Sequence, residues 1–150
     1  MKNLIIILII IFLCYLSCFA TSDTNPISGL WLSQNKDAII EIFSRNDLFF
    51  GKIVWLEEPL NEMGNPKKDI ENPDPALRNR QIWGLEILQN FEQKKNKWKG
   101  GSIYDPESGK TYSCTMKLKG NYLYIRGFIG ISLLGRTEVW SRTELESTKP

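Results

Sequence analysis

The sequence predicts an all-β protein: an eight-stranded, antiparallel, up-and-down barrel with one long capping loop. From Gly29 onward, apolar and polar residues alternate in short segments, most of these are separated by brief turns, and residues 58–81 form one much longer connection. Alternation is typical of strands with one buried and one solvated face. Consecutive hairpins over eight strands close most economically into a barrel, because closure removes the unpaired sheet edges.

Eight segments carry the strand pattern. They are 29–34, 37–45, 48–57, 82–91, 97–104, 110–119, 121–129 and 135–143. In the clearest, "TYSCTMKLK", the alternating apolar residues are Tyr112, Cys114, Met116 and Leu118. The intervening "RND", "KKN", "DPESG" and "KGN" consist mainly of residues that favour turns or face water. We therefore expect neighbours in sequence to be neighbours in the barrel.

The predicted interior mixes bulky side chains with small ones. The expected inward residues are Phe49, Trp55, Trp83, Trp98 and Tyr104, together with Gly51, Gly100 and Ser102. An eight-stranded barrel either fills with side chains or encloses one small ligand. Glycines in strands also let a barrel bend, so both explanations stay open. If a cavity exists, its candidate ligand-binding residues are Trp55, Trp83, Trp98 and Tyr104.

Tyr124 and Arg126 share one face of the segment "YLYIRGF" and are two further ligand-binding candidates. An arginine beside a tyrosine can clamp a carboxylate or phosphate with charge-assisted hydrogen bonds, as in a comparable pair in fatty-acid-binding barrels. The alternative places both outside the barrel, with Arg126 in a cross-strand ion pair with Glu138. This alternative is the one that we favour.

The long connection, "EPLNEMGNPKKDIENPDPALRNRQ", contains four of the seven prolines and one short helical pattern at 75–80. Such loops are often lids or binding loops, and we expect this one to cap one end of the barrel. Its candidate functional residues are Asp69, Asn72, Asp74 and Arg78. Their oxygens could bind a hard cation, but turn and helix-capping roles fit Asp69, Asn72 and Asp74 better.

The tip of the last hairpin, "RGFIGISLLGR", is unusually apolar for a turn. Ile131, Leu133 and Leu134 therefore need a cover. Three covers are open: the side chains plug the barrel, line a ligand entrance, or touch a membrane or partner. Plugging the barrel is the expectation that we favour.

The N-terminus predicts export. Lys2, the apolar run Leu4–Leu13 and a small residue at Ala20 form a signal peptide over 1–20. We expect a short segment at 21–28, the barrel at 29–143, a tail at 144–150, and no transmembrane span after cleavage. The mature protein would be periplasmic or secreted, and acylation of Cys18 as a lipoprotein is the minor alternative.

Composition excludes several classes of function. Loss of Lys2 with the leader reduces the 19 basic residues to 18, against 17 acidic ones, so the near-neutral chain argues against nucleic-acid binding. The absence of histidine excludes Ser-His-Asp, Cys-His and zinc chemistry. Cys114 alone remains after cleavage and is expected to be a core residue. We predict no enzyme, cofactor or metal site. A histidine-free hydrolase using Asp69 and Glu71 is the least supported hypothesis.

Two short motifs resemble those of the lipocalin and calycin group. "GLW" opens the first strand and "WSR" ends the last, which marks Gly29, Trp31, Trp140 and Arg142 as structural residues. The resemblance implies that Arg142 stacks on Trp31 across a closed barrel end.

A longer set of motifs, "GKIVWL", "GNPKKDIENPDPALRNR", "WGLEIL", "WKGGSIYDPESGKTYSC" and "YLYIRGFIGISLLGRTEVWSR", resembles the bacterial exported family known as domain of unknown function 2147. This resemblance implies a lipocalin-like barrel and no particular activity. Our leading hypothesis is an exported binding module for an apolar or amphiphilic, lipid-like small molecule. The alternative is a ligand-free envelope or secreted module that recognises a protein through residues 58–81.

Overall fold

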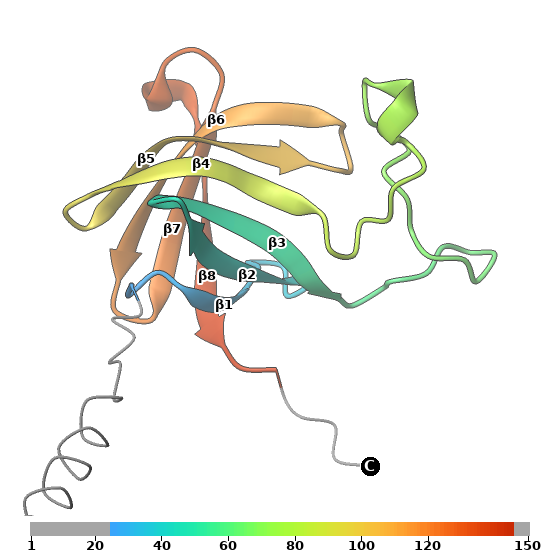
Figure 1. Cartoon of the computed structure of the whole chain (residues 1–150), viewed down its shortest axis with the longest axis horizontal. Helices are drawn as coiled ribbons and strands as arrows, with labels where there is room; N and C mark the ends of the chain where they lie inside the picture. The colour runs from blue at the N-terminus through green and yellow to red at the C-terminus, as the bar shows by residue number, and fades with distance from the viewer. Residues whose placement is uncertain (1–24, 146–150) are drawn as a thin grey trace, which may run out of the picture.

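Eight antiparallel strands close into one barrel in the computed structural model, which describes residues 25–145. Each strand pairs with its sequence neighbours, and the first pairs with the last (Figure 1). The strands are β1 (Gly29–Leu32), β2 (Ala38–Arg45), β3 (Leu48–Leu56), β4 (Glu86–Lys94), β5 (Lys97–Asp105), β6 (Lys110–Lys119), β7 (Tyr122–Phe128) and β8 (Arg136–Thr143). Two 3-10 turns, η2 (Pro75–Leu77) and η3 (Ser132–Leu134), lie in connections. The predicted fold class is confirmed.

The predicted signal peptide, the alternative at Cys18 and most of the tail lie outside the described residues. Among residues 25–145, no helix has the length and apolar character needed to cross a bilayer.

Up-and-down topology gives the barrel two different ends. The connections after β1, β3, β5 and β7 gather at one end, which we call the mouth. The short turns after β2, β4 and β6 lie at the opposite, closed end, where β1 begins and β8 finishes.

The closed end is a packed core. Its fully buried side chains include Ile27, Trp31, Phe91, Trp98 and Leu123. The barrel is tied to the segment before it, because the indole N–H of Trp31 donates to the carbonyl of Ile27 at 2.8 Å. Burial of such large apolar surfaces is the main stabilising contribution to a fold of this size.

Arg142 covers Trp31 at this end, as the motif resemblance implied. The guanidinium carbon lies 4.1 Å from the centroid of the indole, and the same group donates to the carbonyls of Ser28 and Pro26. Gly29, at a φ of 121°, leaves the space for it, since a Cβ there would lie 2.8 Å from Arg142 Nη1. Trp140, the fourth structural residue, is buried on β8.

Register shifts move several residues away from their predicted faces. Between Trp98 and Gly101 the β5–β6 register shifts, so Gly101 and Ile103 face inward where Gly100 and Ser102 were expected. A second shift lies between β2 and β3, where Val54 has no partner of its own. Leu56 then reaches the interior in place of Trp55.

The fourth strand begins later than predicted, at Glu86 rather than at residue 82. Gly84, at a φ of 83°, turns the chain before the strand. Trp83 therefore lies outside the barrel with 55% of its surface exposed, which contradicts its predicted inward position. Ile87 and Leu88 are both buried, so the expected alternation is also broken within the strand.

Candidate ligand-binding cavity

A cavity of about 1110 Å³ occupies the mouth half of the barrel. Five isoleucines from five strands form its apolar wall: Ile40, Ile53, Ile87, Ile103 and Ile125. Residues of all four mouth connections, including Asn35, Glu58, Pro106 and Leu134, also line it. The cavity is therefore enclosed by strands and bordered by loops, as a binding site for a small molecule would be.

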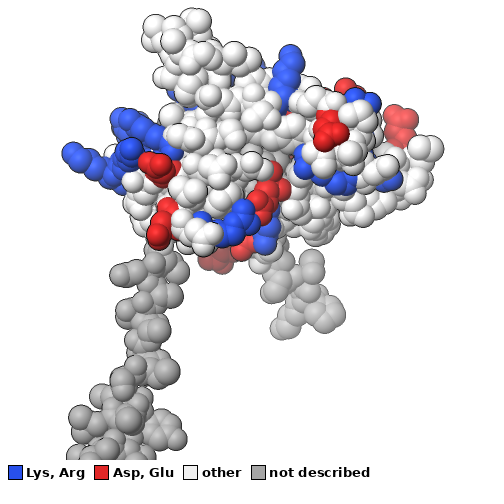
Figure 2. Space-filling view, turned by 45° about the horizontal axis from the view of Figure 1, so that its top comes forward, with Lys and Arg blue, Asp and Glu red and all other residues white. Residues whose placement is uncertain are grey.

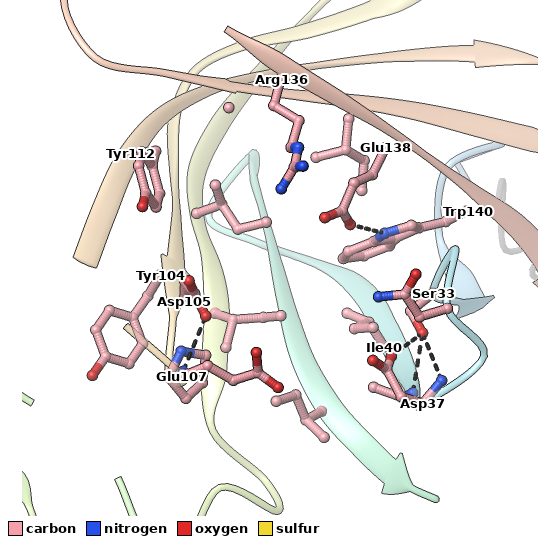
Figure 3. A pocket seen from close by; sticks show the side chains of 18 of the residues that line it. Ser33, Asp37, Ile40, Tyr104, Asp105, Glu107, Tyr112, Arg136, Glu138 and Trp140 are labelled. Carbon is pink, nitrogen blue, oxygen red and sulfur yellow. Dashed lines mark hydrogen bonds between the residues drawn. The ribbon is translucent and has the colours of Figure 1, made fainter. Parts of the chain in front are cut away.

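One wall of the cavity is polar, and β8 supplies it. Arg136, Glu138 and Trp140 alternate along this strand and stand opposite Gly127, Ile125 and Leu123 of β7. All three β8 side chains point into the space shown in Figure 3. The indole N–H of Trp140 donates to Glu138 Oε2 at 3.0 Å, which fixes this carboxylate on the wall.

The mouth carries more acid than base. The acidic residues that line the cavity are Asp37, Glu57, Glu58, Asp105, Glu107 and Glu138, and the basic ones are Lys67 and Arg136. Lys67 is paired with Glu58 at 3.2 Å. The excess of acidic residues at this opening therefore favours the entry of cations over that of anions.

The long connection is attached to the barrel beside the mouth. It runs out to one side of the strands (Figure 1) and contributes Lys67 to the cavity rim. Its attachment is Asp69, a carboxylate with 0% exposure that accepts from the Tyr104 hydroxyl at 2.5 Å. Asn72 donates to the same carboxylate at 2.8 Å, and Arg80 at 2.8 Å. The long connection is therefore anchored to β5 at the mouth end of the barrel and borders the cavity.

Burial and hydrogen bonds shift the pKa values of the two ionisable groups in this attachment, Asp69 and Tyr104. Burial by itself would raise the pKa of Asp69, but hydrogen bonds from Tyr104, Asn72 and Arg80 outweigh it and hold the pKa below its ordinary value. Burial, together with the hydrogen bond to Asp69, raises the pKa of Tyr104. Asp69 is thus an ionised, fully partnered carboxylate with a structural role.

The other loop candidates also form internal contacts. Asn72 Oδ1 accepts from the backbone N–H of Asp74, and Asp74 Oδ1 caps η2 through the N–H of Ala76. Arg78 donates to the carbonyl of Asn72 at 2.7 Å. The contacts of Asn72 and Asp74 match the turn and capping roles predicted for them. The same role was predicted for Asp69, but its side chain instead binds Tyr104 of the barrel.

Of the six predicted ligand-binding residues, Tyr104 borders the cavity and the other five do not. The Tyr104 ring nevertheless points away from the space in Figure 3, with its hydroxyl on Asp69, which contradicts its predicted inward position. Trp98 is buried in the closed-end core, against Phe49. Trp55 is turned outward by the register shift between β2 and β3, and Trp83 lies in the loop before β4. Tyr124 lies on the outer face, beneath the ammonium group of Lys119 at 4.7 Å.

Arg126 also lies outside, and it holds the loop between β7 and β8. Its guanidinium donates to the carbonyls of Ser132 and Leu133 and to the hydroxyl of Thr137. The predicted ion pair with Glu138 does not form, because Arg126 stands opposite Thr137 while Glu138 faces inward.

The apolar tip does not plug the barrel, which contradicts the cover that we favoured. Leu133 and Leu134 are 81% and 80% exposed, and Leu134 borders the mouth. Residues 127–135 contain no charged side chain, and the projecting lobe at the top of Figure 2 is accordingly uncharged. Hydrogen bonds from Arg126 hold the loop outward in this position.

Glu138 is the main site residue that sequence reasoning missed. The signal for it was present, since Glu138 lies two residues before Trp140 and shares its face in an alternating strand. A glutamate on an inward face is rare enough in a core to indicate a polar function.

Comparison with known proteins agrees with this geometry. A family model described as an uncharacterized protein conserved in bacteria (DUF2147) matches residues 29–142. The chain is a member of this family. The match spans the barrel from the first residue of β1 almost to the end of β8, and the family description assigns no activity.

A solved structure shows the same fold. This chain is 27% identical in sequence to protein HP1028 from Helicobacter pylori, a protein reported to belong to the lipocalin family. The TM-score is 0.70, and the alignment covers 82% of this chain and 86% of that chain. No curated protein matches this chain in sequence. A lipocalin-like barrel is an architecture suited to binding small molecules.

Proposed function

We propose that this protein is an exported binding module for an apolar or amphiphilic, lipid-like small molecule, with no catalytic role. The observation that carries the proposal is the cavity of about 1110 Å³, which combines an isoleucine wall with one polar strand. Pockets that bind small molecules commonly have such volumes and combine apolar walls with a few polar groups. Export is proposed from the leader sequence at residues 1–20.

Gly127 offers a way to test the cavity. It lines the space, and a Cβ built on it would be 3.5 Å from Ile103 and 3.6 Å from Tyr112, which is ordinary contact. Gly127→Leu should therefore place a side chain in the cavity, whereas Gly127→Ala should add only one methyl group. Gly51 is less suitable, since its Cβ would lie 2.8 Å from Leu88.

The experiment is native mass spectrometry of the protein purified without detergent, before and after incubation with fatty acids, fatty alcohols, fatty amines and phospholipids. We expect a reproducible adduct with the natural chain and with Gly127→Ala, and its loss with Gly127→Leu. Thermal unfolding of all three proteins controls for folding. A bare mass under every condition, or equal adducts in a folded Gly127→Leu protein, would contradict the proposal.

A second candidate is a protein-interaction module that uses the long connection. The favouring observation is that this segment is attached through Asp69 while Met63 and Ile70 remain 81% and 66% exposed. Replacing both with serine should abolish capture of a partner and leave cavity adducts unchanged. Partner capture that survives this double substitution would contradict the candidate.

A further inference from the structure

We propose that the ligand of this cavity carries a protonated amine, bound at Glu138, on an apolar chain. This inference rests on the proposed function and deepens it, because it specifies the chemical class of the occupant. It follows from the partners of Glu138, the charges at the mouth and the wall opposite.

Glu138 is a half-buried carboxylate with incomplete partners. Its Oε2 accepts from the indole of Trp140, and among residues 25–145 no other group donates to the side chain. Arg136 points into the same cavity but, within the described chain, forms no ion pair with Glu138 at 4.0 Å or less. A carboxylate can accept several hydrogen bonds, so Glu138 retains capacity for a donor from the cavity. An ammonium group would satisfy it with charge-assisted hydrogen bonds.

The charged residues along the approach to Glu138 also favour a positively charged ligand. A ligand entering from the mouth passes Asp37, Glu57, Asp105 and Glu107. Two cations also line the route: Lys67, which is paired with Glu58, and Arg136. Clefts lined by one sign of charge concentrate ions of the opposite sign. The acidic residues along this route outnumber Lys67 and Arg136, so the net charge repels a fatty acid anion and attracts a protonated amine.

The remaining wall suits a hydrocarbon chain. In a closed ring of eight strands, β4 stands across the barrel from β8, so Ile87 faces the side that carries Glu138. Ile53 and Ile103 flank Ile87 on the neighbouring strands. An amine head at Glu138 therefore leaves the chain of the ligand against isoleucine, where burial of apolar surface favours binding.

Isothermal titration calorimetry with three probes of equal chain length tests the inference. The probes are dodecylamine, dodecanol and dodecanoate, each below its aggregation concentration, at neutral pH and low salt. We expect dodecylamine to bind about tenfold more tightly than dodecanol, a difference of about 1.4 kcal/mol. Dodecanoate should bind most weakly, and added salt should reduce the preference for the amine.

Glu138→Gln is the diagnostic variant. Its amide oxygen can still accept from the indole of Trp140, so the wall is preserved while the charge is removed. We expect the affinity for dodecylamine to fall to that for dodecanol, with the dodecanol affinity unchanged. Glu107→Gln is the matched control, because it removes one negative charge from the mouth, and it should reduce the affinity for the amine less than threefold.

The outcomes separate the two proposals. If none of the three probes binds, the lipid-like binding function fails. If dodecanol or dodecanoate binds as tightly as dodecylamine, the amine inference is overturned and the cavity function stands. Retained preference in Glu138→Gln, or an equal loss in Glu107→Gln, would also overturn the role of Glu138. The comparison of the three probes uses the unsubstituted protein, so it tests the amine inference even if a variant fails to fold.

Discussion

Arg142 Cζ lies 4.1 Å from the ring centroid of Trp31, and this contact joins the last strand to the first at the closed end. The arginine also hydrogen-bonds the carbonyls of Ser28 and Pro26. Arg142→Ala should lower the free energy of unfolding by about 1–2 kcal/mol, since a cation–π contact and two partly exposed hydrogen bonds are lost. Urea unfolding measures this loss. Arg142→Lys should recover only part of it, and full recovery would show that charge alone matters.

Asp69 should make stability depend on pH. Its pKa is lowered in the folded protein, so ionised Asp69 stabilises the fold above about pH 4, and that contribution is lost as the pH falls through the folded-state pKa. Asp69→Asn should cost about 2–3 kcal/mol at neutral pH, because the buried hydrogen bonds lose their charge. Unfolding measured from pH 7 to low pH should then show a smaller acid dependence in the variant. Parallel curves for the two proteins would contradict this role.

Tyr104→Phe tests the same attachment from the barrel side. The substitution removes the hydroxyl that donates to Asp69 at 2.5 Å and accepts from Asn72 at 3.0 Å. We expect a loss of about 1.5–3 kcal/mol. Limited proteolysis should cut residues 58–81 faster in this variant. An unchanged cleavage rate would show that other contacts suffice to hold the connection.

Cys114 should be unreactive in the native protein. Burial raises the pKa of its thiol to about 12, and the side chain lies on the inward face of β6. A thiol-reactive disulfide reagent at pH 8 should therefore modify the chain lacking residues 1–20 only at the rate of unfolding, and completely in denaturant. Cys114→Ala is the blank. Rapid modification of the folded protein would contradict the buried position.

Two inward glycines should differ sharply in their tolerance of a methyl group. A Cβ at Gly101 would lie 2.5 Å from the backbone oxygen of Gln89 and from the ring of Phe91. Gly101→Ala should therefore cost about 2–3 kcal/mol through overpacking. Gly127→Ala should change the unfolding free energy by less than about 0.5 kcal/mol, because its nearest neighbours are at contact distance. Similar losses at both positions would contradict the described packing.

Arg126 should control the loop between β7 and β8 without controlling global stability. Arg126→Ala removes the hydrogen bonds to the carbonyls of Ser132 and Leu133. We expect faster amide hydrogen exchange in residues 129–135 and little change in the free energy of unfolding. Arg136→Ala is a matched control, since it removes a charge at the other end of the same loop.

Regular alternation made the fold predictable, and its interruptions limited the prediction of the site. Cys114 and Met116 are buried as expected, because β6 pairs with β7 without a register shift. Bulges near Val54 and Gly100 reverse the inward face within a strand, and no residue type marks them unambiguously. Trp83 was misplaced because a left-handed Gly84 ends the loop after it.

The attachment of the long connection to the barrel could not be predicted from the alternating pattern of the strands. Asp69 and Tyr104 are 35 residues apart in sequence, and all of β4 lies between them in the chain. Turn propensity correctly assigned Asn72 and Asp74 to local hydrogen bonds, because those bonds span two residues. Arg126 was ambiguous for the same reason as Glu138: their faces depend on how β7 and β8 align.

The direction in which the chain enters and leaves the barrel has a practical consequence. The described residues begin and end at the closed end, opposite the mouth. A protein immobilised through the chain next to residue 25 or residue 145 would thus present its opening outward, away from the support. Capture on a sensor chip by a tag placed just before residue 25 or just after residue 145 should consequently preserve access for small molecules, while attachment through the β7–β8 loop should obstruct it.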